Sequence, residues 1–371
     1  MRVLVLNAGS SSVKLRVVEP DDTVVHRVDL DAPRGRPGAG ELEAAALRLA
    51  RDAGGVEAVG HRVVHGGADF TAPTLIDPEV LERIDRLTVL APLHQPPAVA
   101  GIRTMTGALA DVPSVACFDT AFHATMPPSA TTYAVPTRWR AELGLRRYGF
   151  HGLAHDWASG RAAEIVGRPR ERLRVVVAHL GSGASACAVA GGRSVDTTMG
   201  FTPTAGLVMA TRCGDLDPSA VTWLTLHGGV PPAEVDHGLA HASGLLGLAG
   251  DADMRHVLAA ADAGDAEAVL AVDVWVHRAR AQLAGMVAAS GGVDVLAFSG
   301  GVGENAPAVR QRIVEGLGFL GLAVDPDLDA AAVGGSEGDV SAAGATARTV
   351  VVHAREDLVI ARQVRAALGR G

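Results

Sequence analysis

Side chains suited to phosphate chemistry gather in short polar stretches that directly follow apolar runs. The first stretch is Asn7 to Lys14, where three serines follow Gly9 and Lys14 is the only lysine of the chain. Hydroxyl and amide groups on a tight turn make a cradle for phosphate oxygens, and lysine adds a compact charge on a flexible stem. The alternative for Lys14 is a chance survivor in a lysine-poor sequence. Its place beside the hydroxyl-rich turn favours a role in binding a polyphosphate.

Two further glycine-rich segments, 181–183 and 300–303, also come directly after Val-rich or Leu-rich runs. A single glycine-rich turn is weak evidence, because most are ordinary hairpins or strand–helix loops. Three of them, each flanked by hydroxyl or amide groups, favour binding of nucleotide phosphates. None has the spacing of a P-loop or a Rossmann fingerprint. The predicted nucleotide site therefore belongs to another architecture.

Isolated charged and imidazole side chains lie at the ends of predicted strands. Arg62 and Arg212 stand close to glycines and are candidate clamps for carboxylate or phosphate oxygens. Two guanidinium groups can neutralise the charge of a transferring phosphoryl group. Asp119 is a candidate orienting or acid–base carboxylate, and His151 a candidate donor. A solvated surface arginine, a helix-capping aspartate and a structural histidine remain the alternatives.

The apolar runs and breakers indicate alternating strands and helices, which is an α/β fold. The expected strands are 2–6, 15–18, 23–30, 56–64, 112–118, 174–180, 184–189 and 293–298, and the expected helices are 41–53, one starting at 77, 98–109, 219–227, 265–289 and 307–317. The segment 90–97, rich in proline, is expected to break the helical pattern. In α/β folds ligands bind beyond the strand ends. The polar stretches are therefore expected to share a cleft between two domains.

The opening of the chain is echoed in its middle. Residues 174–183 align without a gap on residues 2–11, so that Arg174 falls on Arg2 and Gly181 on Gly9. A Val-rich strand before a Gly/Ser turn is common, but these two copies stand at the starts of two halves of domain size. We interpret the echo as an internal duplication. A chain of 371 residues also fits two domains better than one.

Composition narrows the functional class. The net charge of −8 argues against a general nucleic-acid or anionic-membrane partner. Three scattered cysteines without CxxC spacing suggest reduced thiols rather than a disulfide framework or a zinc site. The short opening apolar run is not typical of a signal peptide, and no stretch approaches the roughly 18 apolar residues of a membrane span. The sequence thus predicts a soluble, cytoplasmic protein.

With these motifs assembled, the whole chain resembles the acetate kinase family of short-chain carboxylate kinases. The resemblance is carried by the stretches 7–14, 61–67, 118–123, 148–152, 211–218, 301–305 and 356–362. It implies the ribonuclease H-like fold shared by sugar kinases, heat-shock chaperone ATPases and actin, duplicated in two domains around a cleft. The implied boundaries are 1–147 plus 357–371 for the first domain, with a returning last helix, and 148–356 for the nucleotide-binding domain. It also implies a homodimer and reversible phosphoryl transfer from ATP to acetate.

The resemblance also implies roles for individual residues. Asn7 and Glu356 resemble the ligands of Mg²⁺, with Mn²⁺ as an alternative metal. The catalytic residues it implies are Arg62, Asp119, His151 and Arg212. The nucleotide contacts it implies are Lys14, Ser10, Ser12, His179, Leu180, Gly181, Ser182, Gly183, Asp253, Met254, Arg255, Gly301, Val302, Gly303, Glu304 and Asn305. Beside Arg62, the acetate pocket it implies consists of Val64, Leu93, Phe150 and Pro203, for which plain core packing is the alternative.

Two positions depart from the family pattern. Ser182 stands where asparagine is usual and Gln95 where asparagine is usual. Neither change removes a charged group, so an active enzyme is expected. A propionate or butyrate kinase of the same family remains an alternative, because one methylene changes discrimination by only ~1–3 kcal/mol. A non-enzymatic, actin-like nucleotide switch is the alternative from another class.

Overall fold

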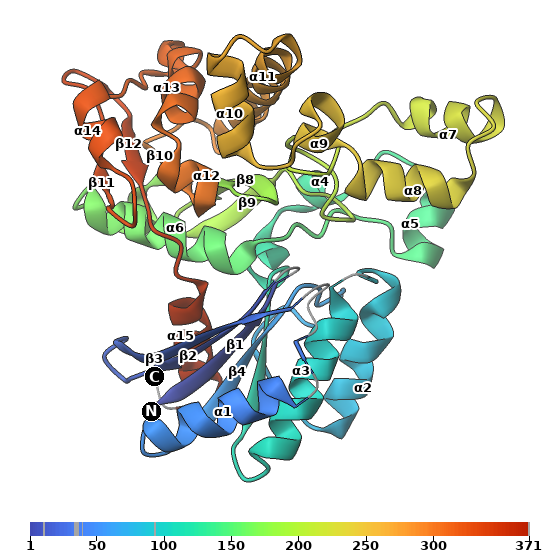
Figure 1. The fold of residues 1–371 in the computed structure, drawn as a ribbon, viewed down its shortest axis with the longest axis vertical. Coiled ribbons are helices and arrows are strands. Elements are labelled where there is room, and N and C mark those ends of the chain that lie inside the picture. Colours follow the sequence, from blue (N-terminus) through green and yellow to red (C-terminus); the bar gives the residue numbers. More distant parts are fainter. Residues whose placement is uncertain (10–11, 33–36, 39, 93, 370–371) are drawn as a thin grey trace. The chain divides into compact units, whose positions relative to one another are not determined.

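The computed structural model describes residues 1–9, 12–32, 37–38, 40–92 and 94–369. The chain divides into two compact units (Figure 1). Unit 1 comprises Met1–Ala124, Phe150–Trp157 and Arg355–Gly371, and unit 2 comprises Thr125–Gly149 and Ala158–Ala354. Within the described part of the chain, no helix is both long enough and apolar enough to cross a bilayer.

Unit 1 is built on a six-stranded mixed sheet with the order β3-β2-β1-β4-β6-β5. β1 pairs antiparallel with β2 and parallel with β4, which in turn pairs parallel with β6. The strands are β1 (Val3–Ala8), β2 (Ser12–Val18), β3 (Val24–Asp31), β4 (Ala58–Val63), β5 (Thr74–Leu75) and β6 (Ser114–Phe118). The helices are α1 (Glu41–Asp52), α2 (Pro78–Arg86), η2 (Leu87–Val89), α3 (Gln95–Ala108), η3 (Ala121–Thr125) and α15 (Glu356–Ala367).

Strand β1 is apolar on both sides because helices cover both faces of its sheet. Leu4 and Leu6 join the cluster formed with α1 and α3, while Val3 and Val5 join the cluster formed with α15. The last helix of the chain, dark red in Figure 1, thus packs on the sheet that the first strand begins. A methyl group on Gly60 of β4 would lie 2.6 Å from Ile360 of α15, so the close approach of helix and sheet requires glycine there.

Unit 2 repeats this architecture with the order β11-β12-β10-β7-β8-β9. Its strands are β7 (Arg174–Leu180), β8 (Ala184–Ala190), β9 (Arg193–Thr197), β10 (Val295–Ser299), β11 (Gly338–Asp339) and β12 (Arg348–Val351). Its helices are α4 (Pro128–Thr131), α5 (Thr137–Leu143), η4 (Arg170–Arg172), α7 (Pro218–Leu226), α8 (Pro232–His241), α9 (Gly244–Ala249), α10 (Met254–Asp262), α11 (Ala266–Ala289), α12 (Gly300–Asn305), α13 (Pro307–Glu315), η5 (Gly318–Leu320) and α14 (Pro326–Ala331). Helix α6 (Gly152–Ile165) begins in unit 1 and continues in unit 2.

The matching strand orders confirm the duplication expected from the sequence. β7 pairs antiparallel with β8 and parallel with β10, as β1 pairs with β2 and β4. The aligned residues Arg2 and Arg174 also make equivalent contacts. Each donates its backbone N–H to a carboxylate just before the neighbouring parallel strand, at 2.7 Å to Glu57 and 2.9 Å to Asp294. The two copies therefore share local anchoring as well as topology.

Two expectations about local structure were wrong. The glycine-rich segment 300–303, expected as a turn, is the start of helix α12; Gly300, with φ of 79°, makes the sharp entry. The predicted break at 90–97 ends earlier, because α3 begins at Gln95. Prolines 96 and 97 fall in its first turn, where the missing N–H groups have no helical partner to lose.

The division into units also differs in detail from the expected domain boundaries. Residues 125–147, expected in the first domain, belong to unit 2. The reason lies in Arg147, which donates hydrogen bonds to the carbonyls of Thr197, Thr198 and Met199. The chain returns to unit 1 at Arg355, close to the expected position 357.

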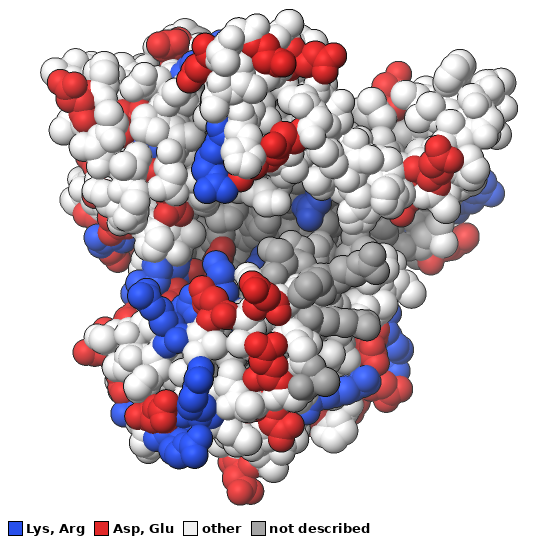
Figure 2. Space-filling view, in the orientation of Figure 1, with Lys and Arg blue, Asp and Glu red and all other residues white. Residues whose placement is uncertain are grey.

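The visible face carries acidic and basic side chains interspersed with one another (Figure 2). Such mixing accords with a modest net charge of −8 and leaves any strong anion site to local groups of arginines.

Candidate active site

In unit 1, predicted catalytic residues lie at the carboxyl ends of neighbouring parallel strands. Asn7 is near the end of β1, Arg62 near the end of β4, and Asp119 directly follows β6. Because parallel strands end at the same edge of a sheet, the three side chains converge there. Glu356 is the first residue of α15 and reaches the same edge.

These four side chains form one hydrogen-bonded chain. Arg62 donates from Nη2 to Oδ2 of Asp119 at 2.7 Å, and from Nε to both carboxylate oxygens at 3.2 Å. Its Nη1 donates to Oδ1 of Asn7 at 3.1 Å, and Nδ2 of Asn7 donates to Oε2 of Glu356 at 3.4 Å. The structure thus brings together Asn7, Arg62, Asp119 and Glu356, four residues that the sequence analysis assigned to catalysis or metal binding.

The Arg62–Asp119 pair is largely removed from water, with 16 % and 1 % of the side chains exposed. Burial alone would lower the pKa of Arg62, but the charge of Asp119 and its hydrogen bonds outweigh burial and raise the pKa. Arg62 therefore stays charged at any working pH. A fork that is fixed on two oxygens of one carboxylate also has a defined orientation.

His151 lies beside this network with a strained backbone. Its φ is 56°, and among the described residues only Asp22 is another non-glycine with positive φ. The next residue, Gly152, donates its N–H to the Asp119 carbonyl at 2.9 Å, and a methyl group there would lie 2.0 Å from that oxygen. The ring of His123 bonds the Phe150 carbonyl at 2.9 Å. Strain that neighbouring contacts enforce is typical of functional residues.

Further predicted residues of unit 1 surround this edge. Lys14 of β2 stands opposite Asn7 of β1 in the antiparallel register, so both side chains lie on the same face of the sheet. Ser12 starts β2, and Val64 follows β4. Phe150 is buried, with its ring 5.3 Å from that of His65. Ser10 and Leu93 lie outside the described residues.

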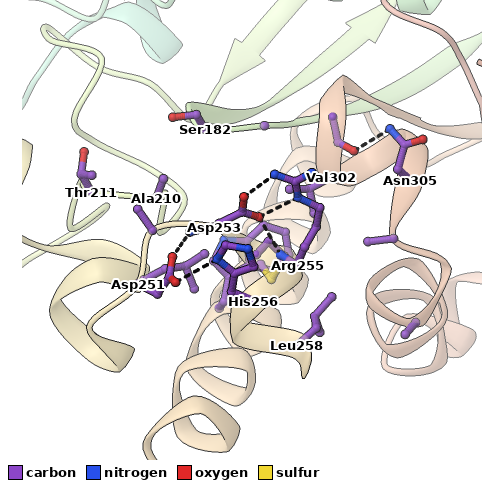
Figure 3. Close-up of a pocket in the computed structure, with 18 of the residues that line it drawn as sticks. Ser182, Ala210, Thr211, Asp251, Asp253, Arg255, His256, Leu258, Val302 and Asn305 are labelled. Carbon is purple, nitrogen blue, oxygen red and sulfur yellow. Dashed lines mark hydrogen bonds and ion pairs between the residues drawn. The ribbon is translucent and has the colours of Figure 1, made fainter. Parts of the chain in front are cut away.

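Unit 2 holds a cavity of about 960 Å³, drawn in Figure 3. Its size is that of a site for a nucleotide-sized ligand. The predicted nucleotide contacts that line it are Gly181, Ser182, Asp253, Met254, Arg255, Gly301, Val302 and Asn305. The lining joins the turn after β7, the start of α10, and helix α12.

The lining of the cavity combines apolar side chains with an ion pair at the start of α10. Ala210, Leu245, Leu258 and Trp275 belong to the apolar lining. Asp253 caps α10 by accepting from the Arg255 N–H at 2.9 Å and also pairs with the Arg255 side chain (Figure 3). Hydrogen bonds from Arg255 lower the pKa of Asp253. An apolar slot beside charged groups suits a flat base joined to a phosphate chain.

The remaining predicted nucleotide residues lie outside this lining. His179 and Leu180 end β7, and Gly183 completes the turn by accepting from the Gly181 N–H. Glu304 points inward. Its carboxylate accepts from the N–H groups of Gly300 and Ala354, both at 3.0 Å, and contacts the His353 ring at 2.6 Å. Glu304 thus holds helix α12 in place.

Arg212, in the loop before α7, has an unusual environment. It donates to the Pro203 carbonyl at 3.1 Å and approaches Sδ of Met209 at 3.7 Å. Burial lowers its pKa, and within the described part of the chain no carboxylate pairs with it. A largely buried cation that meets only neutral acceptors is prepared to receive an anion.

Comparison with known proteins decides the family. A model of the acetokinase family matches residues 41–362. The chain belongs to the acetokinase family. It is 45 % identical over 399 residues to an acetate kinase of Streptomyces griseus, covering 99 % of this chain and 96 % of that one. It is also 45 % identical over 381 residues to an acetate kinase of Micrococcus luteus, covering 98 % of each.

Solved structures agree with this assignment to the acetokinase family. Acetate kinase from Porphyromonas gingivalis has a TM-score of 0.89 at 34 % identity and covers 99 % of both chains. A propionate kinase from Francisella tularensis has a TM-score of 0.89 at 35 % identity and covers 98 % of both chains. A ROK hexokinase from Thermus thermophilus, with a TM-score of 0.51 at 17 % identity, shares the fold and covers the full length of both chains.

The structure shows the contacts of the two residues that depart from the acetokinase pattern. Gln95 is buried and donates from Nε2 to the carbonyls of His65 and Ile84, at 3.0 and 3.2 Å. Ser182 lines the cavity, and its backbone carbonyl accepts from the Ala210 N–H at 3.1 Å.

The sequence analysis did not identify every residue that lines the cavity of unit 2. Asp251 and His256, which bond each other at 3.0 Å, flank the predicted segment 253–255. Thr211 directly precedes the predicted Arg212. Extending the predictions at 253–255 and at 212 by up to two positions on each side would have included Asp251, His256 and Thr211. Trp275, in the middle of α11, gave no such signal.

Proposed function

We propose that the chain catalyses reversible phosphoryl transfer between ATP and acetate, giving acetyl phosphate and ADP. The observation that carries the proposal is the network in which Arg62 is locked on Asp119 and bridged through Asn7 to Glu356. It presents one fixed cation and two oxygen ligands at a strand edge. Phosphoryl transfer is catalysed by positioning and by neutralising charge, and these groups supply both.

The chemistry needs no general base, because an acetate oxygen is already a nucleophile at neutral pH. Asp119 accepts hydrogen bonds from Nε and Nη2 of Arg62. Its role is to orient the guanidinium toward the transferring group. Arg212, which pairs with no carboxylate of the described chain, and His151 supply the remaining donors to the equatorial oxygens. We expect direct in-line transfer, because hydrogen-bond donors of this kind stabilise a planar phosphoryl group.

Asn7 and Glu356 fit a Mg²⁺ site. Their side chains are within hydrogen-bond distance of each other, and oxygen ligands are those Mg²⁺ prefers, usually one or two carboxylates with substrate phosphates and water. Among the described residues, no group of three or more His, Cys, Asp or Glu side chains is placed to hold a metal ion. Asn7 and Glu356 would hold the metal, which when bound would neutralise charge on the phosphates.

The cavity of unit 2 is proposed to hold the nucleoside of ATP. Its apolar lining takes the base, and Ser182 of the turn after β7 and Gly301 in the first turn of α12 offer backbone N–H groups to phosphates. Lys14 is proposed to contact the phosphate chain. An ATP-dependent reaction and cysteines that are free thiols support a cytoplasmic location.

We also propose that the protein is a homodimer that uses the surface of α7. Trp223 and Leu226 of this helix are 58 % and 76 % exposed, and the preceding Leu216 is 47 % exposed. Large apolar side chains gathered on one exposed helix are typical of a subunit interface. Sedimentation of the wild type and of a Trp223→Glu variant tests this proposal. A wild-type monomer would contradict it.

The substrate preference concerns the carboxylic acid that accepts the phosphoryl group. The likeness to a propionate kinase at 35 % identity makes propionate the second candidate. ATP-dependent hydroxamate formation with acetate, propionate and butyrate measures the preference directly. We expect acyl phosphate with acetate and loss of activity in Arg212→Ala, with Arg86→Ala, which removes an exposed arginine of α2, as the control. No acyl phosphate with any of the three acids would refute the proposal.

A further inference from the structure

Arg212 owes its orientation to neutral groups. Arg62 is held by a carboxylate, whereas Arg212 is held by the Pro203 carbonyl at 3.1 Å and touches Met209 Sδ. A carbonyl positions a guanidinium only as well as the carbonyl itself is positioned. The loop that carries Pro203 therefore decides where Arg212 points.

The loop 200–203 is fastened by Tyr133, which lies between α4 and α5. Its Oη accepts a hydrogen bond from the Phe201 N–H at 2.9 Å. The same oxygen lies close to Gly200: a methyl group on Gly200 would be only 2.4 Å from Oη of Tyr133. The Gly200 carbonyl accepts in turn from the Tyr148 N–H at 3.1 Å. The phenol of Tyr133 thus sits at the point where the loop turns.

The start of the loop is fixed from the same side. Arg147 donates from Nη1 to the carbonyls of Thr197, Thr198 and Met199, at 2.8, 3.0 and 3.0 Å. The Arg147 guanidinium also lies 5.8 Å from the centre of the Tyr133 ring. At the end of the loop, the Gly200 N–H donates to the Thr202 carbonyl and the Thr204 N–H donates to Oγ1 of Thr202, both at 3.3 Å. Because these bonds brace residues 200–204 as one turn, the bond between Tyr133 and the Phe201 N–H positions Pro203 together with that turn.

We propose that Tyr133 is a positioning residue for phosphoryl transfer, acting through the Phe201 N–H and the Pro203 carbonyl on Arg212. This inference rests on the proposed function, in which Arg212 receives the transferring phosphoryl group. Burial raises the pKa of Tyr133, so its hydroxyl stays neutral and does not compete with the substrate anion for Arg212. A carboxylate in its place would fasten the loop but also attract the arginine.

The first test is Tyr133→Phe, which removes the oxygen and leaves the ring. We expect kcat to fall about tenfold, the size of one lost buried hydrogen bond, with the KM for ATP unchanged. Tyr148→Phe is the matched control, because it removes a hydroxyl that bonds the Gly144 carbonyl at 3.3 Å, outside the loop, and keeps the ring, which lies 6.1 Å from that of Phe201. A fall in Tyr133→Phe no larger than in the control would overturn the proposal.

A double-variant cycle separates positioning from general destabilisation. In an Arg212→Lys background the arginine that Tyr133 positions is absent, so adding Tyr133→Phe should change kcat by less than about threefold. An undiminished tenfold effect in that background would mean that Tyr133 acts by another route.

A chemical readout that does not depend on turnover completes the test. The rate at which phenylglyoxal modifies Arg212, followed by mass spectrometry, should change in Tyr133→Phe, while the rate at the exposed Arg255 should not. Unchanged Arg212 reactivity refutes the positioning role. If the wild type makes no acyl phosphate but Arg212 reactivity still shifts, the proposed function fails and the structural link stands.

Discussion

Replacing Arg62 by lysine keeps the positive charge and removes the fork. In the structure the guanidinium reaches Asp119 through two nitrogens and Asn7 through the third. A single ammonium group can satisfy one of these partners well, so at least two contacts are lost. Asp119 keeps a cation beside it, which avoids the ~3–5 kcal/mol penalty of leaving a buried charge unpaired.

The expected result is therefore a catalytic defect larger than the structural one. If Arg62 must face the transferring phosphoryl group in a fixed orientation, its loss costs about 10²–10³ in kcat, or ~3–4 kcal/mol of barrier. The KM for ATP should change less than kcat, because Arg62 does not line the cavity that is proposed to hold the nucleoside. Hydroxamate formation under saturating acetate and thermal unfolding of the same samples provide both numbers.

The control is Arg83→Lys, which alters a more exposed ion pair of unit 1, 3.4 Å from Asp69. Such pairs contribute at most about 1 kcal/mol, and no change in kcat is expected. A kcat for Arg62→Lys within about threefold of the wild type, which is under 1 kcal/mol of barrier, would refute the reasoning that orientation matters.

Three further predictions follow from single contacts. Arg255→Ala should raise the KM for ATP without lowering the unfolding temperature, because the side chain is 85 % exposed on the cavity rim; an unchanged KM would remove it from the nucleotide site. Burial lowers the pKa of His65 from 6.5 to about 4 and the Gly67 N–H donates to its Nδ1, so unfolding scans should show stability falling as pH drops from 6.5 toward 4, where only the unfolded chain takes up the proton. His65→Gln should reduce that decline, the rest of which comes from the buried His61, whose pKa is lowered to about 3; a decline as steep as in the wild type would contradict the prediction. Gln95→Asn should lower the free energy of unfolding by about 1 kcal/mol in denaturant titrations, because the shorter amide cannot reach both carbonyls; an unchanged midpoint would show that the bonds can re-form.

The elements predicted well were those whose signals are local. The run of Val and Leu before Gly9 predicted β1 and the turn to β2. A strand that is buried on both faces has apolar residues at every position, so its sequence is an unbroken apolar run. Asp77 before Pro78 predicted the start of α2, and the Asp77 carboxylate indeed accepts from the Val80 N–H at 2.7 Å. These signals need no knowledge of distant residues.

Helix α12 could not be predicted in this way. Three glycines in four residues disfavour a helix, and the segment is helical because distant groups hold it. Arg310 donates to the carbonyls of Gly303 and Glu304, at 2.9 and 3.0 Å, and is itself paired with the buried Asp329. Strand β12 was missed for a related reason, since its four residues acquire an extended form by pairing with β10.

The residues predicted for the site were those that stand in recognisable motifs, and those missed lie outside them. Asn7, Arg62, Asp119 and Glu356 meet because four separate segments end at one sheet edge, and their residue types suggested chemistry before any fold was known. Ala210 and Trp275 line the cavity without a functional group that sequence could single out. The contact between Tyr133 and Phe201 depends on a loop path that no local pattern indicates.

The duplicated sheets imply that the two halves of the chain differ in their tolerance of substitutions. In the proposed function, the edge of the first sheet acts through the side chains of Asn7, Arg62 and Asp119, so substitutions there are expected to change the chemistry. At the matching edge of the second sheet, Ser182 and Gly301 are proposed to act through backbone groups, which belong to no particular amino acid. Ser182 in place of the usual asparagine illustrates the resulting freedom. Substitutions are therefore expected to be more costly for function at the edge of the first sheet than at the matching edge of the second.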